Sequence, residues 1–234
     1  MLAVFKRDLK AYFTSPLGYV FIAAFLAVMN AFFYIYNVSQ AYSQLSSVFN
    51  FMVYTLIFVT PLLTMRLFSE EFKQKTDQLL LTSPVKVRSI VFGKFLAALA
   101  IFAIALAVTL LYVVIIASHG QPNVRELLAN YFAIFCVAAA FISIGVFISS
   151  LTENQLVSAV LTLAVFLILY LIDTSGFGAQ SAFLNNLLYS ISLFVRYTTI
   201  SNGVLALSDL VFYVSVAAIF IFATTRVIEK KRWS

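Results

Sequence analysis

Residues 66–94 read RLFSEEFKQKTDQLLLTSPVKVRSIVFGK and form a charged segment between two long apolar runs. This charged segment holds nine of the chain's 24 Asp, Glu, Lys and Arg residues. The whole chain is 63% hydrophobic and only 10% charged, so polar side chains are scarce elsewhere. Their concentration here predicts a water-facing surface on a chain that is otherwise apolar.

The composition is that of an integral membrane protein. A soluble globular domain has about 25% charged residues, whereas this chain has 25 Phe residues and a mean hydropathy of +1.02. A membrane-spanning helix takes about 20 residues, so 234 residues accommodate roughly six of them and no sizeable water-soluble domain. We therefore expect an all-α membrane protein with six transmembrane helices in one domain, residues 1–234. Any cytoplasmic chemistry must come from another chain.

Several classes of function are excluded by what the chain lacks. With Cys136 in an apolar run and His119 as the single histidine, a disulfide framework and a Cys/His metal site are both excluded. Gly93-Lys94 is the only Gly-Lys pair and lacks the preceding glycine of a Walker A loop, so we do not expect this chain to hydrolyse ATP. The first apolar run begins near Pro16 without a small-residue cleavage site, so we expect it to remain in the mature protein.

Hydropathy predicts where the six spans lie, and small residues predict close packing between them. Alanines recur through the third span, and Ala139, Ser143, Gly145 and Ser149 punctuate the fourth. Pro61 should kink the second span close to the charged segment. The expected spans are residues 17–37, 48–65, 95–117, 130–150, 156–172 and 208–225.

Residues 1–15 predict a short amphipathic helix that lies in the membrane interface. Lys6, Arg7 and Lys10 lie mostly away from its apolar face. That face comprises Leu2, Phe5, Leu9, Tyr12 and Phe13. A solvated basic leader that only sets the topology is the alternative.

Residues 174–207 have neither the composition of a span nor that of a loop. Apolar residues recur at helical spacing among polar ones, which predicts one or two short external helices that dip into the membrane edge, or an amphipathic helix on the surface. Asp173 and Asp209 stand at the ends of spans, where carboxylates more often face water.

The distribution of Lys and Arg predicts the topology. With six spans, 13 of these cations fall on one side and two, Arg125 and Arg196, on the other. The positive-inside rule then places both termini and the charged segment in the cytoplasm, and this distribution accounts for the net charge of +6 without nucleic acid. No expected span carries a charge at mid-depth, which argues against a proton- or sodium-coupled carrier and against a charge-lined channel.

The charged segment reads as a helix, a bend and a second short helix. Ser69 is expected to cap the first helix, with Glu70 and Glu71 near the positive end of its dipole, and a Glu71–Lys75 pair is possible at i,i+4 spacing. Thr76 and Asp77 offer a second cap before Gln78. The apolar side chains of Leu79, Leu80 and Leu81 must then be shielded from water by lipid, by the chain's own helices or by a partner protein.

The charged segment resembles the cytoplasmic loop of type-2 ABC transporter permeases, and more narrowly the GldF-like group, named from the gliding-motility permease. The resemblance rests on Arg66-x-x-x-Glu70-Glu71-x-x-x-Lys75-Thr76-x-x-Leu79-Leu80-Leu81-Thr82-Ser83-Pro84-Val85, followed by Ile90-x-x-Gly93-Lys94. The chain's ending is similar too, with Phe194, Gly203, Asp209-x-x-x-Tyr213, Arg226-x-x-Glu229 and Arg232-Trp233. The group usually has Gly before the Thr and Glu two residues after it, where this chain has Lys75 and Gln78.

This resemblance implies a six-span half-transporter of a bacterial or archaeal plasma membrane, most often an exporter. Its partners would be a second permease subunit, identical or not, two cytoplasmic ABC ATPase subunits that bind ATP and Mg²⁺, and membrane lipid. This chain would hold no cofactor and carry no catalytic residue. The coupling residues would be Glu70, Glu71, Lys75, Thr76, Asp77, Gln78, Leu79, Leu80 and Leu81. A membrane anchor that recruits a cytoplasmic partner without transporting anything is the alternative function.

Overall fold

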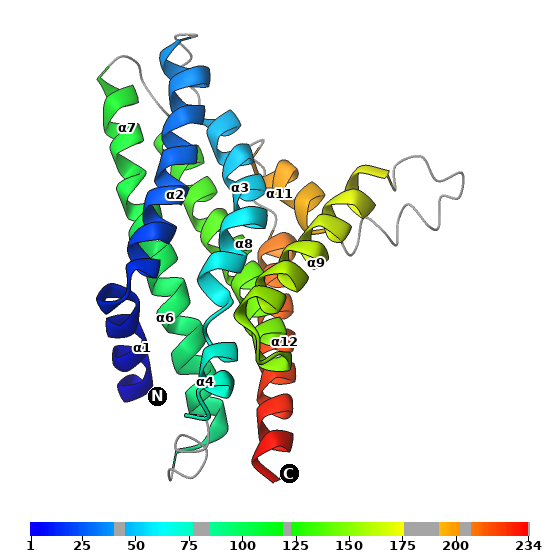
Figure 1. Cartoon of the computed structure of the whole chain (residues 1–234). Coiled ribbons are helices and arrows are strands. Elements are labelled where there is room, and N and C mark those ends of the chain that lie inside the picture. Colours follow the sequence, from blue (N-terminus) through cyan, green and yellow to red (C-terminus); the bar gives the residue numbers. More distant parts are fainter. Residues whose placement is uncertain (40–44, 77–84, 119–122, 176–191, 202–206, 234) are drawn as a thin grey trace, which may run out of the picture.

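The computed structural model describes residues 1–39, 45–76, 85–118, 123–175, 192–201 and 207–233, and these residues form helices and no strand. Within them, six helical stretches are long and apolar enough to cross a membrane. The expected all-α architecture with six spanning helices is therefore confirmed (Figure 1). Both termini lie at the same end of the bundle as the charged segment.

The described helices follow the predicted order. They are α1 (Leu2–Thr14), α2 (Pro16–Phe33) with its π-helical extension η1 (Tyr34–Val38), α3 (Ser46–Thr64), α4 (Ser69–Lys73), α6 (Val87–Val108), α7 (Leu110–Ala117), α8 (Val124–Leu151), α9 (Gln155–Ser175), α11 (Leu193–Ser201) and α12 (Leu207–Trp233). Three of them extend well beyond the expected spans: α6 begins at Val87 rather than 95, α8 begins at Val124 rather than 130, and α12 runs on to Trp233 rather than 225. Hydropathy marks only the apolar part of a helix, whereas backbone hydrogen bonding continues into the polar residues beside it.

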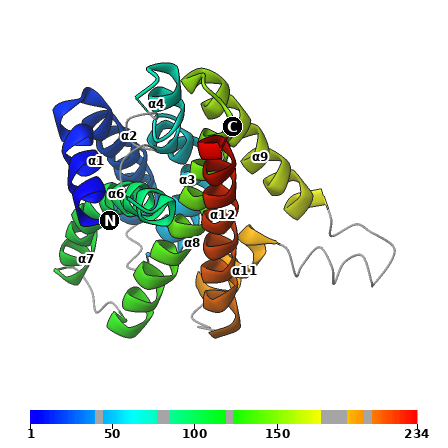
Figure 2. The same ribbon diagram turned by 90° about the horizontal axis from the view of Figure 1, so that it is seen from below.

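Helix α8 forms the centre of the bundle. It packs against α12, α3, α6, α9 and α11, and 78% of its most apolar stretch is buried, compared with 17% for α9. Viewed along the bundle, α1 lies at one edge and α9 at the other (Figure 2). The upper part of α9 leans away from the other helices (Figure 1).

Small residues bring the central helices close together, as expected. A Cβ atom on Gly145 of α8 would lie 2.8 Å from the Cβ of Thr64 in α3, so only glycine fits at this crossing. Ala97, Ala98 and Ala105 of α6 are fully buried. The free thiol of Cys136 lies in the same core.

Helix α1 packs on α6 through a face that was not predicted, beside the apolar face expected to meet the membrane. Of the five residues expected on its apolar face, only Tyr12 is buried, and the packed face is Val4, Asp8 and Tyr12. A buried carboxylate is tolerated here because Lys94 of α6 lies beside it. Lys6, Arg7 and Lys10 are exposed, as predicted. That α1 lies in the membrane interface stays a prediction.

The two aspartates at span ends do not face water. Asp173 of α9 accepts a hydrogen bond from the backbone N–H of Phe194 at the start of α11, at 3.0 Å, and Asp209 of α12 pairs with Arg196 of α11 at 2.8 Å. Both carboxylates are buried. Helix α11 lies within residues 174–207, whereas its position relative to the membrane stays a prediction, and residues 176–191 and 202–206 lie outside the described residues.

Candidate functional site

Four of the nine predicted coupling residues lie in the described part of the chain. Glu70 and Glu71 belong to α4, and Lys75 and Thr76 form the turn that follows it. Asp77, Gln78, Leu79, Leu80 and Leu81 lie outside the described residues. The geometry below therefore concerns the helix that leads into this stretch and its attachment to the bundle.

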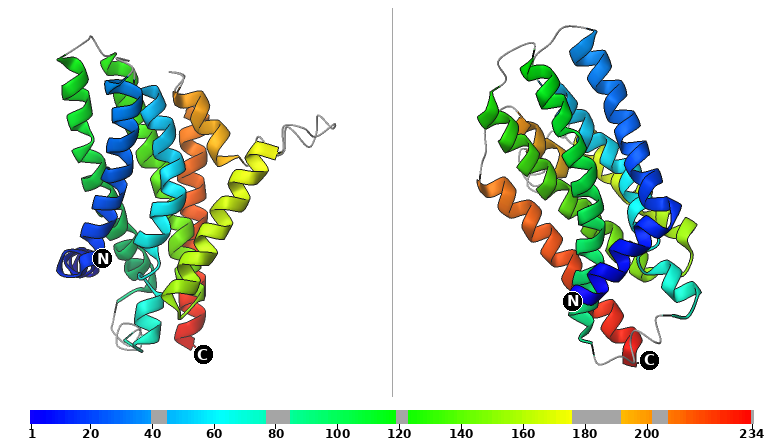
Figure 3. Two further views of the ribbon diagram at one scale, coloured as in Figure 1. Left: turned by 45° about the horizontal axis from the view of Figure 1, so that its top comes forward. Right: turned by 90° about the vertical axis from the view of Figure 1, so that its left-hand side faces the viewer.

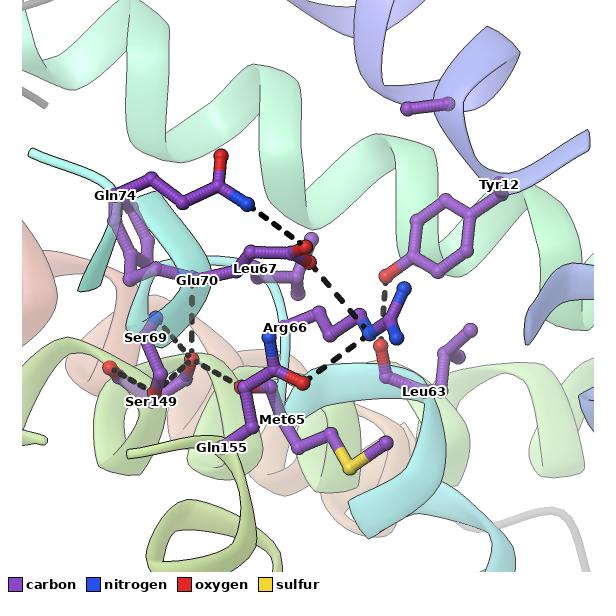
Figure 4. A network of polar contacts seen from close by, with 12 residues as sticks. Tyr12, Leu63, Met65, Arg66, Leu67, Ser69, Glu70, Gln74, Ser149 and Gln155 are labelled. Carbon is purple, nitrogen blue, oxygen red and sulfur yellow. Dashed lines mark hydrogen bonds and ion pairs between the residues drawn. The ribbon is translucent and has the colours of Figure 1, made fainter. Parts of the chain in front are cut away.

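The start of α4 is capped from another helix, so the prediction that Ser69 is the N-cap is wrong. Ser69 is the first residue of α4, and Phe68 before it supplies no side-chain cap. The N–H groups of Phe68 and Ser69 instead donate to Oγ of Ser149 in α8, at 3.1 and 3.3 Å, and Oγ of Ser69 donates to the Ser149 carbonyl oxygen at 3.0 Å (Figure 4). A serine on α8 thus satisfies backbone donors that the helix start leaves free.

A second contact ties α4 to the neighbouring turn through side chains that are partly open to solvent. The Nε atom of Arg66 lies 3.5 Å from Glu70 Oε2 and donates to Gln155 Oε1 at 3.3 Å. Gln74 donates to the other oxygen of Glu70 at 3.3 Å (Figure 4). Because the charged side chains are about one third exposed, this ion pair contributes little to stability.

A buried lysine holds α4 to α6. The Lys94 ammonium, whose side chain is 3% exposed, lies 2.9 Å from Glu71 Oε1 and donates to the Leu67 carbonyl oxygen at 2.6 Å. The possible Glu71–Lys75 pair is therefore replaced by a partner on another helix. Lys94 also lies 5.1 Å from the ring centroid of Phe68, within cation–π range.

The same lysine joins α1 to this site. Its Nζ lies 3.4 Å from Asp8 Oδ2, and Arg7 pairs with Asp8 and Glu71 at 2.7 Å each. Burial alone would lower the pKa of Arg7, but the hydrogen bond and charge of Asp8, together with those of Glu71, raise it above its ordinary value. Two cations and two carboxylates from α1, α4 and α6 therefore form one neutral cluster, the Lys94 cluster (Arg7, Asp8, Glu71 and Lys94).

Helix α4 ends in a Schellman turn with a lysine at the position that favours glycine. The Thr76 N–H donates to the Glu71 carbonyl and the Lys75 N–H to the Phe72 carbonyl, at 3.0 and 3.1 Å. This pattern requires a left-handed residue between helix and loop, and Lys75 has a φ of 55°. The bend predicted after the first helix is therefore present, although this chain has Lys75 where the group it resembles usually has glycine.

Two further contacts fix the surroundings of α4. The Tyr12 hydroxyl of α1 donates to the Leu63 carbonyl at the end of α3, at 2.7 Å (Figure 4), and burial raises the pKa of this phenol, so it stays a donor. Lys231 of α12 lies 3.6 Å from the ring centroid of Phe72. Helix α4 thus contacts side chains from α1, α6, α8 and α12.

A cleft lies between α1 and α4 beside these contacts. It has a volume of about 420 Å³ and is lined by Arg7, Tyr12, Arg66 and Glu70 among others, and it reaches Thr76. The cleft therefore places side chains of α1 close to the turn that follows α4.

Sequence reasoning missed Asp8 and the capping role of Ser149. Asp8 carries a usable signal, since Val4, Asp8 and Tyr12 recur at four-residue spacing on one helical face, with a basic residue available at the cytoplasmic start of the third span. Ser149 was expected only as a small packing residue, and nothing in its neighbours points to the distant backbone groups that it binds.

The sequence matches a family model described as ABC-2 family transporter protein, over residues 2–228. No curated protein is similar enough to the chain to count as a match. The family match covers nearly the whole chain, including α1, α4, α6 and α8 of the site, and ends before Lys231.

Proposed function

This chain belongs to the ABC-2 transporter family, and on that premise we propose that it is the permease half of an ATP-driven exporter of the GldF-like group. ATP and Mg²⁺ bind to two separate ATPase subunits, and a second permease subunit completes the pathway. The chain is multi-pass in a bacterial or archaeal plasma membrane, with both termini and the charged segment in the cytoplasm.

The attachment of α4 carries this proposal. A coupling element must be held rigidly to the spans, because a loosely attached one would move without moving them. Helix α4 is short, yet it is bonded to α8 through Ser149 and to α6 and α1 through the Lys94 cluster. A displacement of residues 76–81 by a partner therefore reaches three helices at once, as a rigid-body change requires.

The buried charges explain why such a connection transmits force. Breaking a buried ion pair by removing one partner costs about 3–5 kcal/mol, so α4 cannot separate from Lys94 at small cost. Leu79, Leu80 and Leu81 supply the apolar contact that seats this unit in a groove of the ATPase. Uncharged, aromatic-rich spans favour an amphipathic or lipid-like cargo.

The test is to purify the chain from its native membranes with its ATPase, and to compare ATP hydrolysis and transport in Leu79→Asp and Leu80→Asp variants. We expect both variants to insert normally and to lose transport. ATP hydrolysis by the ATPase should then no longer be coupled to transport. Leu151→Asp is the matched control, since Leu151 is an exposed leucine on the same predicted cytoplasmic side and should leave transport unchanged.

Normal transport in Leu79→Asp and Leu80→Asp would show that the leucines are not the coupling contact. The alternative is a membrane anchor. It would be identified if the wild type shows no ATP-dependent activity and the variants fail to recruit a partner.

A further inference from the structure

A wholly apolar groove lies between α1 and α6. It has a volume of about 340 Å³, within the range of small-ligand sites, and its walls are Met1, Leu2, Phe5, Leu96, Leu99, Ala100, Ala103 and Phe135. Helix α1 crosses α6 (Figure 3). At the crossing, a Cβ atom on Gly93 would lie 3.0 Å from the Val4 side chain, so the two helices are in direct contact.

The groove runs along the most apolar spanning stretch of the described chain. The walls contributed by α6 cover residues 96–103, about 10 Å of helix at 1.5 Å per residue, within the stretch Val87–Ala117, whose mean hydropathy is 3.0. No side chain in the walls offers a hydrogen bond, so a water molecule in the groove would have no side-chain partner. The surrounding membrane supplies hydrocarbon chains, which fit such a surface.

Two exposed cations lie outside the walls of the groove, one on each of its two helices. Lys6 is one turn from Leu2 on α1, and Arg88 lies on the same face of α6 as Leu96 and Leu99, about two turns nearer its cytoplasmic end. Both are exposed. Among the residues that the structure describes, neither has an ion-pair partner, unlike Arg7 and Lys94 beside them.

We propose that this groove binds one acyl chain of an anionic phospholipid of the cytoplasmic leaflet, with the headgroup held between Lys6 and Arg88. The apolar walls select the hydrocarbon, and the two cations select a negative headgroup. The site differs from ordinary boundary lipid because α1 lines the acyl chain on one side while α6 and Phe135 of α8 line the other.

The experiment places the full chain in bilayer discs of phosphatidylcholine that contain a trace of phosphatidylglycerol with a photoreactive acyl chain. After illumination, labelled peptides are mapped by mass spectrometry. We expect label concentrated on residues 1–5 and 96–103, and removed more effectively by unlabelled phosphatidylglycerol than by phosphatidylcholine. Label spread evenly over the exposed faces of α9 and α12 would show boundary lipid only and overturn the proposal.

Variants test the two halves of the site separately. Ala103→Trp, or Ala100→Trp if the first does not insert, fills the groove and should lower the label at least about fivefold, whereas Ala107→Trp, one turn further and outside the walls, should not. Lys6→Gln and Arg88→Gln should each weaken competition by phosphatidylglycerol about fivefold, and Lys230→Gln should not. Unchanged labelling in the tryptophan variants, or equal competition by both lipids in the wild type, would contradict the proposal.

Discussion

Lys75 shows how a single residue shapes the turn that leads from α4 toward residues 77–81. Its φ of 55° lies in the left-handed region, where an L-residue with a Cβ is disfavoured by about 1–2 kcal/mol and glycine is not. The sequence alone indicates a bend here, because a capping pair, Thr76 and Asp77, follows the helix. It does not reveal that the bend is a Schellman turn, since lysine is not the usual residue at that position.

Replacing Lys75 with glycine should tighten this turn. Lys75→Gly removes the Cβ strain, so the amides of residues 75 and 76, which bond to Phe72 and Glu71, should exchange with deuterium about fivefold more slowly. Lys73→Gly is the matched control, because Lys73 is helical and glycine there should speed exchange by a similar factor. Exchange in Lys75→Gly as fast as in the wild type would show that the turn carries no strain.

Other residues show where sequence reasoning stops. Glu70 and Glu71 were correctly expected in the first turn of α4, because helix dipole and spacing are local. Ser69 was assigned the wrong role, since its partner Ser149 is 80 residues away in sequence. Asp8 was missed because a carboxylate on a packed face needs a charged partner, and the sequence does not show that Lys94 lies beside it.

At the scale of the element, α4 is held by partners rather than by its own length. Its five residues form too short a helix to be stable alone, and its stability comes from Ser149, Lys94 and Arg7. Removing one partner should therefore loosen the whole element. The partly exposed pair Arg66–Glu70 should matter far less.

Lys94→Met should detach both α4 and α1 from α6 and leave the Arg7–Glu71 pair as the ionic link between α1 and α4. The substitution removes the buried cation from Asp8 and Glu71, which keep only the half-exposed Arg7 as a partner, and losing a buried partner costs about 3–5 kcal/mol. With spin labels at the exposed positions Lys10 and Lys73, pulsed electron resonance should give a narrow distance distribution in the parent protein and a broad one in Lys94→Met. Arg66→Gln is the control, and a distribution that stays narrow in Lys94→Met would show that the cluster does not position α4.

At the scale of the whole molecule, hydropathy and charge were enough to predict six spans in the right order. The extension of helices past the predicted spans, as in α6 from Val87 and α12 to Trp233, was not predicted, because helix formation does not follow hydropathy. Which helix lies at the centre was not predicted either, since packing depends on small residues such as Gly145 meeting a particular neighbour, Thr64.

The topology is tested by labelling from outside the cell. Tags at both termini and at position 86 should be shielded from impermeant reagents, whereas a cysteine at position 121 should react, because 13 of the 15 Lys and Arg residues fall on the predicted cytoplasmic side. The native Cys136 is buried and provides a low background. The reverse labelling would overturn the orientation of the bundle.

The most direct test of the account follows ATP-driven motion through the Lys94 cluster to the outer ends of the spans. In a Cys136→Ala background reconstituted with its ATPase, single cysteines at the exposed positions Val38, Val124 and Leu207 are labelled with and without ATP. We predict that ATP changes their labelling rates in the parent protein, and that Lys94→Met abolishes this change while ATPase binding persists. An undiminished response to ATP in Lys94→Met would contradict the claim that α4 moves the spans through Lys94.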